Sequence, residues 1–175
     1  MNLLFRLLRV VLSYRFRGPA AFADETVLTF RVWPTDLDYL WHMNNGKYFA
    51  LMDLGRFDML LRTGFVRVMR ANKWYGVVAS ETMRFRRSLT PFQRFELRTR
   101  TIGWDEKSFY LQHTFVRNGE VIGVAIVRAR FLSGQTHAAL NAVEVAEAVS
   151  PGAVSSPLPE YIRSLQAAEK EYSKV

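Results

Sequence analysis

The spacing of apolar residues predicts one helix near the N-terminus and a second, more apolar helix further along the chain. At the N-terminus, apolar residues at positions 3, 4, 7, 8, 11 and 12 follow the period of an amphipathic helix. The second helix is predicted over Gly46–Thr63, where apolar side chains cover most of the circumference. A helix of that kind is normally buried on nearly all sides. Asn44 or Asn45 is the expected N-cap residue.

Runs rich in Val, Phe, Tyr and Thr predict five strands. They are Glu25–Trp33, Tyr75–Arg86, Phe92–Trp104, Lys107–Arg117 and Glu120–Leu132. Asn118-Gly119 separates the last two strands and is typical of a two-residue hairpin turn. Short connections favour antiparallel pairing. Helical patterns return over Ala139–Val149 and after Pro159. The order predicts an α+β fold, with one antiparallel sheet wrapped around the apolar helix.

Length and composition narrow the class of protein. The 175 residues suit a single structural unit, which we divide into an N-terminal helix (1–20), a central domain (21–138) and a C-terminal helical extension (139–175). Because the chain has no cysteine, disulfides, thiolate nucleophiles and cysteine zinc sites are excluded. The three histidines, His42, His113 and His137, are scattered, so we expect no metal site. No cofactor is expected either.

Half of the net charge of +8 lies in the first seventeen residues, at Arg6, Arg9, Arg15 and Arg17, and no acid precedes Asp24. Two interpretations of this segment stay open. The helix of residues 1–17 could lie on an anionic membrane surface, or it could pack on the body of the protein or on a second subunit. The segment is too short and too often interrupted by arginine to predict a transmembrane span or a cleaved signal peptide. We expect a cytoplasmic protein, with peripheral membrane contact under the first interpretation.

The segment from Asp36 to Tyr48 concentrates polar chemistry directly before the apolar helix. It holds Asp36, Asp38, His42, Asn44 and Asn45. The first N–H groups of a helix have no partner inside it, so they can stabilise an oxyanion. A carboxylate just upstream could attack a carbonyl carbon or activate water. The alternative is an Asx-rich turn with a helix cap, which local chemistry alone favours.

A resemblance to a known family changes this balance. Phe30-Arg31-Val32-Trp33, followed by Asp36-x-Asp38-x-x-x-His42-x-Asn44-Asn45-x-x-Tyr48, resembles the hotdog-fold acyl-CoA thioesterases of the 4-hydroxybenzoyl-CoA thioesterase type. The resemblance covers about residues 25–135. It implies a hotdog fold, in which an antiparallel sheet wraps a long central helix. It also implies hydrolysis of an acyl-CoA thioester to a free acid and CoA.

Carried over by position, the resemblance assigns roles to the residues of the loop. Asp38 matches the catalytic aspartate, as nucleophile or general base. Asn45 and Gly46 open the helix whose N–H groups would hold the thioester oxygen. His42 and Asn44 would shape the turn or orient water. Tyr48 would line the acyl pocket.

Two other acids and two departures from the family pattern complete this assignment. Asp36 is expected to form the turn. Asp53 is a rival catalytic acid, although its spacing favours an ion pair with Arg56. Trp41 stands where the family often has a glycine before the histidine, and Phe92-Gln93 replaces a common Gly-Asp.

The resemblance also implies a CoA partner with phosphates to bind. Arg84, Arg86, Arg87 and Arg128 are the candidates, since arginine binds phosphate through a planar fork. We expect a homodimer or homotetramer, paired through an exposed edge at Glu120–Leu132 or Phe92–Trp104. Nucleic acid is not expected, because no known binding signature accompanies the charge. A second hypothesis remains: a non-catalytic protein on the same scaffold that binds an acyl ligand or a membrane surface.

Overall fold

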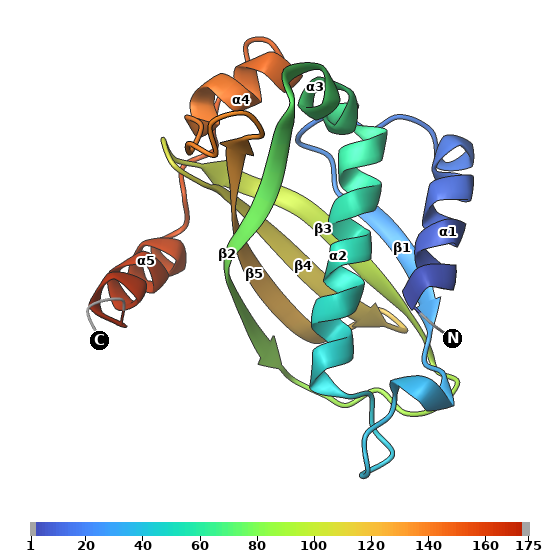
Figure 1. Ribbon diagram of the computed structural model, residues 1–175. Helices are drawn as coiled ribbons and strands as arrows, with labels where there is room; N and C mark the ends of the chain where they lie inside the picture. The colour runs from blue at the N-terminus through green and yellow to red at the C-terminus, as the bar shows by residue number, and fades with distance from the viewer. Residues whose placement is uncertain (1–2, 173–175) are drawn as a thin grey trace.

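The computed structural model describes residues 3–172 (Figure 1). The helices are α1 (Leu3–Ser13), α2 (Asn45–Arg62), α3 (Phe65–Asn72), α4 (Ala142–Val149) and α5 (Glu160–Tyr172). Two short 3-10 helices are η1 (Tyr14–Arg17) and η2 (Pro34–Asp36). The strands are β1 (Thr26–Arg31), β2 (Trp74–Phe85), β3 (Arg94–Trp104), β4 (Phe109–Arg117) and β5 (Glu120–Ser133). The outer ends of the two predicted helical segments, residues 1–2 and 173–175, lie outside the described residues.

The five strands form one antiparallel sheet in the order β1-β3-β4-β5-β2. The sheet curves around α2, which is the central helix in Figure 1. This confirms the α+β hotdog arrangement. The helix approaches the sheet most closely at Gly55, where an added Cβ would lie 2.5 Å from Thr99 Oγ1. Glycine at this position therefore lets the α2 backbone pack directly on β3.

The Asn118-Gly119 turn joins β4 and β5 as the sequence predicts. Both residues have positive φ, 50° for Asn118 and 79° for Gly119. Positive φ at both central residues is the geometry of a type I′ turn, whose twist matches that of the flanking strands. Arg117 and Glu120 are consequently paired across the hairpin.

The predicted sheet edges are wrong. Strand β5, predicted over Glu120–Leu132, lies between β4 and β2, and β3, predicted over Phe92–Trp104, lies between β1 and β4. Their backbone groups are therefore already paired on both sides. The edges are β1 and β2, because β1 crosses over to pair with β3 and β2 crosses over to pair with β5. Any pairing between copies through a strand edge must use one of these two.

Helix α3 was not predicted, since residues after Gly64 were interpreted as β-rich. The helix starts after Gly64, whose φ is 76°, and ends at Lys73, whose φ is 56°. Phe65 is buried and stacks on Phe131 with the ring centroids 4.8 Å apart. A tertiary contact with β5 therefore anchors this short helix, and an eight-residue apolar pattern does not by itself distinguish helix from strand.

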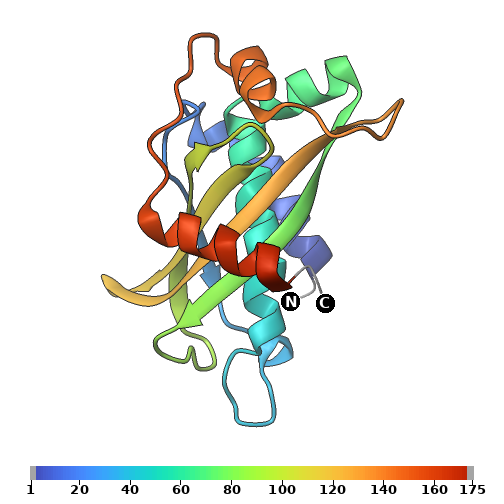
Figure 2. The same cartoon turned by 90° about the vertical axis from the view of Figure 1, so that its left-hand side faces the viewer.

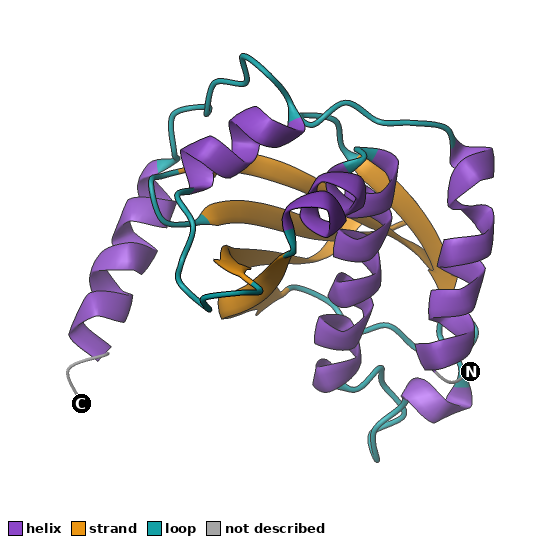
Figure 3. Ribbon diagram, turned by 45° about the horizontal axis from the view of Figure 1, so that its top comes forward, coloured by secondary structure: helices purple, strands orange, loops and turns teal. Residues whose placement is uncertain are grey.

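The sheet carries helices on both faces. Helix α5 crosses the face opposite α2, in front of the strands in Figure 2. Its Ile162 is fully buried, and its Glu169 forms an ion pair with Arg128 of β5 at 2.8 Å. Helix α1 lies on the other side, next to α2 and β1, as Figure 3 also shows. The N-terminal segment thus packs on the body of the protein.

Candidate active site

The loop between β1 and α2 is closed at its neck by hydrogen bonds. The Asn44 N–H donates to the Asp36 carbonyl at 2.8 Å, and Leu37 and Met43 form an isolated bridge. The Met43 N–H donates to the Leu89 carbonyl at 2.8 Å, which joins the loop to the segment after β2. The neck is therefore closed on itself and anchored to a segment that lies far from it in sequence.

Asp38 lies inside this closed loop and is partly buried. Its Oδ1 accepts hydrogen bonds from the Leu40 N–H at 2.9 Å and from the His42 N–H at 3.2 Å. The Asp38 N–H in turn donates to the His42 carbonyl at 2.8 Å. Both side-chain bonds use one oxygen, so the carboxylate is oriented while Oδ2 stays outside this pair of bonds. The Asx-turn interpretation is correct for the geometry, and it leaves an oxygen for chemistry.

The tip of the loop is formed by bulky exposed side chains. Tyr39, Leu40 and Trp41 follow one another and are all exposed. Trp41 has a φ of 60°, in the left-handed region that favours glycine. A glycine would adopt this backbone without strain, and Phe92 repeats the pattern with a φ of 64°. In this chain both turns keep the glycine-like backbone and carry an aromatic side chain.

The start of α2 is capped by Asn44. Its Oδ1 accepts from the Gly46 N–H at 2.9 Å, and its carbonyl accepts from the Lys47 N–H. The N-cap expected at Asn44 or Asn45 is therefore Asn44. The cap occupies the Gly46 N–H that was predicted to hold an oxyanion. Asn45, the first residue of the helix, follows the cap and is exposed.

Tyr48 belongs to the core. Its ring packs edge-on against Phe85 and Phe115, with centroid distances of 5.2 and 5.0 Å, and the residue is fully buried. Burial raises the pKa of the Tyr48 phenol, and a hydrogen bond with the Leu89 backbone acts in the opposite direction. The side chain is therefore part of the packed core at the start of α2. It lines none of the main cavities among the described residues.

Three of the four predicted phosphate-binding arginines lie at the end of β2 that leads to Leu89. Arg84 is on β2, and the N–H groups of Arg86 and Arg87 both donate to the Ile122 carbonyl. Arg87 forms an exposed ion pair with Glu120 at 2.8 Å. These arginines come shortly before Leu89 in the chain. The Leu89 carbonyl accepts a hydrogen bond from the Asp38 loop, so the loop and the arginines are linked through this short segment. Arg128 is instead paired with Glu169 under α5, opposite Ser80 in the β2–β5 register.

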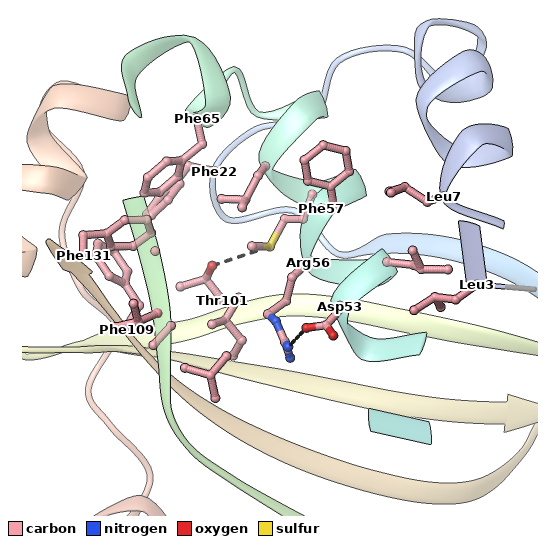
Figure 4. A pocket seen from close by; sticks show the side chains of 18 of the residues that line it. Leu3, Leu7, Phe22, Asp53, Arg56, Phe57, Phe65, Thr101, Phe109 and Phe131 are labelled. Carbon is pink, nitrogen blue, oxygen red and sulfur yellow. Dashed lines mark hydrogen bonds and ion pairs between the residues drawn. The ribbon is translucent and has the colours of Figure 1, made fainter. Parts of the chain in front are cut away.

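The most apolar of the large cavities, here termed the main cavity, lies elsewhere, next to Asp53 (Figure 4). It has a volume of about 680 Å³ and is mostly apolar. Its walls come from α1, α2, α3, the segment before β1 and the inner face of the sheet, with Leu3, Leu7, Phe22, Phe57, Phe65, Phe109 and Phe131 among them. Sequence reasoning did not place Phe22, Phe65 or the leucines of α1 at a site, because their convergence depends on packing.

The charged groups at this cavity are paired with one another. Arg56 contacts Asp53, as the spacing of the two residues predicts, and it reaches Glu81 of β2 at 2.9 Å. Beneath them, His113 is fully buried with Nδ1 3.0 Å from Thr99 Oγ1. No group of three His, Asp or Glu side chains suited to a metal ion occurs within residues 3–172. Asp53 is therefore a paired acid beside an apolar cavity, whereas Asp38 is an oriented acid in a loop.

Comparison with known proteins identifies the family. A family model described as the thioesterase-like superfamily matches residues 32–164, a span that includes the Asp38 loop and all of α2. The chain belongs to this superfamily. One relative, Protein THEM6 of Danio rerio, is 36% identical over 148 residues, which make up 83% of this chain and 73% of the relative.

Solved structures of a probable thioesterase and of a CoA-bound hypothetical protein share the fold. The probable thioesterase YbaW of Escherichia coli has a TM-score of 0.68 at 21% identity, covering 71% of this chain and 96% of its own. SAV2348 of Staphylococcus aureus, solved in complex with CoA, has a TM-score of 0.60 at 14% identity and covers 83% and 96%. At these identities the structures establish the hotdog fold of this thioesterase-like chain.

Proposed function

We propose that this protein hydrolyses an acyl-CoA thioester to a free acid and CoA, with Asp38 as the catalytic carboxylate. The observation that carries the proposal is the orientation of Asp38. Its Oδ1 is held by two backbone N–H groups of its own loop, directly before the N-terminus of α2. Membership of the thioesterase-like superfamily and the fold shared with thioesterases support the same reaction class.

The chemistry has two routes that both begin at Asp38 Oδ2. As a nucleophile, the carboxylate attacks the thioester carbon, the C–S bond breaks and CoA leaves as a thiolate that takes up a proton. Water then hydrolyses the resulting anhydride. As a general base, Asp38 removes a proton from water while that water attacks the carbon, and the proton passes to the leaving CoA sulfur. Acyl-enzyme detected by mass spectrometry after rapid quenching distinguishes the first route.

The oxyanion that forms in either route needs hydrogen-bond donors. We assign the Asn45 N–H at the first turn of α2, because the Gly46 N–H already donates to the Asn44 side chain. His42 and Asn44 hold the loop around Asp38 in this proposal. The Gly46 N–H would join the oxyanion site if the Asn44 side chain turns away on substrate binding.

The CoA phosphates are assigned to Arg84, Arg86 and Arg87. They follow one another at the end of β2, and the next segment binds the Asp38 loop through Leu89. A fold relative solved with CoA makes a CoA-type ligand reasonable for this scaffold. Arg128 is left out of this site, since its pair with Glu169 is partly buried under α5, whereas the Arg87–Glu120 pair is exposed.

A homodimer fits this function better than the isolated chain. The free edge strand β2 contributes Gly76, Val77 and Val78 to the wall of the main cavity. A second copy paired along β2 would extend the sheet and help to close that cavity around an acyl chain. Light scattering coupled to size exclusion measures the number of copies, and a monomer at working concentration contradicts this arrangement.

The test of the reaction is an acyl-CoA panel of several chain lengths and aromatic acyl groups, run with two matched variants. In Asp38→Asn the amide oxygen can still accept from Leu40 and His42, so the loop stays closed while the carboxylate is lost. We expect turnover to fall by about 100-fold or more. Asp53→Asn removes the other candidate acid and should leave turnover within a few-fold of the wild type. If Asp53→Asn lost turnover and Asp38→Asn kept it, Asp53 would be the catalytic acid.

One observation favours a second candidate, a non-catalytic protein that binds acyl ligands. The main apolar cavity is lined by Asp53 and not by Asp38 in the single chain. A ligand held there need not reach the Asp38 loop. Binding of acyl-CoA or fatty acid with no hydrolysis of any panel member, and no effect of Asp38→Asn on affinity, would support this function instead.

A further inference from the structure

Helix α1 has the reverse of the usual surface-helix arrangement. Its charged Arg6 faces the body of the protein and is only 3% exposed, and Val10 is buried beside it. Phe5, Leu8 and Leu12 face away from the body and are 62%, 47% and 73% exposed. A surface helix normally presents its polar residues to water and its apolar residues to the core.

One buried and one partly buried ion pair fix this rotation. The Arg6 guanidinium binds Asp36 at 2.5 Å and donates to the Arg31 carbonyl at 3.1 Å. Just after the helix, Arg17 binds the fully buried Asp58 of α2 at 2.5 Å. Turning the apolar side of α1 inward would leave both carboxylates without these partners, which is costly in a buried setting. The outward position of Phe5, Leu8 and Leu12 is therefore built into the fold.

The exposed apolar surface continues beyond α1 and is accompanied by positive charge. We define the outer face of α1 as Phe5, Leu8, Val11, Leu12 and, in η1, Phe16. Phe16 is 91% exposed. The arginines at positions 9 and 15 are also exposed, and no acid precedes Asp24 in the chain.

We propose that the outer face of α1 docks on a lipid bilayer that contains anionic lipids, with the helix parallel to the membrane surface. Apolar side chains would enter the interface, and Arg9 and Arg15 would lie near the headgroup phosphates. A second copy of the chain fits less well, because its outer face would bring the same two arginines, and no residue of that face is acidic. Docking does not require a spanning helix, and none within residues 3–172 is long and apolar enough to cross a bilayer.

The same helix connects the docking face to the main cavity. Leu3 and Leu7 lie on the side of α1 that lines this cavity, as Figure 4 shows. A bilayer at the outer face would therefore lie one helix away from the cavity. Docking itself does not depend on hydrolysis, so its test stands apart from the test of the thioesterase reaction.

The experiment is flotation of the full chain with vesicles of phosphatidylcholine alone and of phosphatidylcholine mixed with phosphatidylglycerol. We expect the wild type to float with the mixed vesicles and less with the neutral ones. The double variant Leu8→Ser/Leu12→Ser should lower the partition coefficient at least about tenfold. The matched control Val143→Ser/Val154→Ser removes two exposed apolar residues of the C-terminal segment and should bind like the wild type. Arg9→Glu/Arg15→Glu should abolish the preference for anionic vesicles.

Three results would overturn the proposal. The wild type could fail to float with mixed vesicles, or the Leu8→Ser/Leu12→Ser variant could float as the wild type does. The wild type could also elute as an assembly on size exclusion while the Leu8→Ser/Leu12→Ser variant elutes as a smaller species. That result would assign the outer face to contact with a second copy. Circular dichroism establishes that the variants are folded. If the double variant does not fold, Phe16→Ser replaces it, because Phe16 is almost fully exposed, and it should weaken flotation in the same way.

Discussion

The Arg6 guanidinium and the Asp36 carboxylate form a buried ion pair that joins α1 to the start of the Asp38 loop. The two groups lie 2.5 Å apart and are 3% and 1% exposed. Asp36 also accepts from the Trp33 N–H at 2.9 Å, and its carbonyl closes the neck of the loop with Asn44. An N-terminal helix thus helps to hold a loop that follows it by some thirty residues of sequence.

This pair can be tested with a double-mutant cycle of Arg6→Met and Asp36→Asn. We expect Arg6→Met to lower the free energy of unfolding by about 3 kcal/mol, because it leaves a carboxylate buried without its cation. The double variant should lose less than the sum of the two single variants. Urea unfolding measures all four proteins. Additive losses would show that the two side chains do not stabilise each other.

The backbone at Trp41 leads to a stabilising substitution. Left-handed φ is unfavourable for a residue with a Cβ by about 1–2 kcal/mol, whereas glycine adopts it freely at a smaller cost in chain entropy. We expect Trp41→Gly to raise the free energy of unfolding by about 0.5–1 kcal/mol. Trp41→Ala removes the same exposed ring but keeps the Cβ, so it should bring no gain. Equal effects of the two changes in urea unfolding would refute the backbone explanation.

The close approach of α2 to β3 reverses the usual effect of alanine in a helix. Gly→Ala normally stabilises a helix interior by up to about 1 kcal/mol. At Gly55 the new Cβ would lie 2.5 Å from Thr99 Oγ1 and 3.0 Å from Leu97 Cδ2. We expect Gly55→Ala to destabilise the protein by about 1–3 kcal/mol. The loss should shrink in a Thr99→Ala background, and an unchanged loss there would point away from this contact.

His113 predicts a dependence of stability on pH. Burial first, and then the nearby Arg56, lower the pKa of His113 well below its usual 6.5. Below pH 6.5 the unfolded chain gains a proton on this histidine that the folded protein does not accept. The free energy of unfolding should therefore fall with decreasing pH, by up to about 1.4 kcal/mol per unit from this group. Above pH 6.5 the group is neutral in both states and contributes nothing to the dependence.

The matched control for this prediction is His113→Gln. Glutamine can still hydrogen-bond to Thr99 Oγ1, but it does not titrate. Urea unfolding of both proteins at several pH values on either side of 6.5 measures the difference. The difference in unfolding free energy between them should change only on the acidic side. Parallel pH curves would mean that His113 keeps an ordinary pKa in the folded protein.

Much of the fold was predictable because its signals are local. The helix over Gly46–Thr63 differs by one residue at each end from α2, and Asn118-Gly119 forms its turn because both residues tolerate positive φ. The Asp38 loop was also visible as a cluster of acids and amides before that helix. The sequence did not show which contacts each group makes. The Gly46 N–H donates to the Asn44 cap, and Tyr48 lies in the core.

The sequence by itself determined the other helices and strands, the hairpin and the cluster of acids and amides before α2, since each depends on neighbours within a few residues, but it missed α3. Only the tertiary structure decided which strands are edges, which side of α1 faces out and where the cavity lies. Helical periodicity defines the faces of α1, but which face is buried depends on whether Asp36 and Asp58 are there to receive Arg6 and Arg17. Such partners come from distant parts of the chain, and burial of their charges makes the choice energetically decisive.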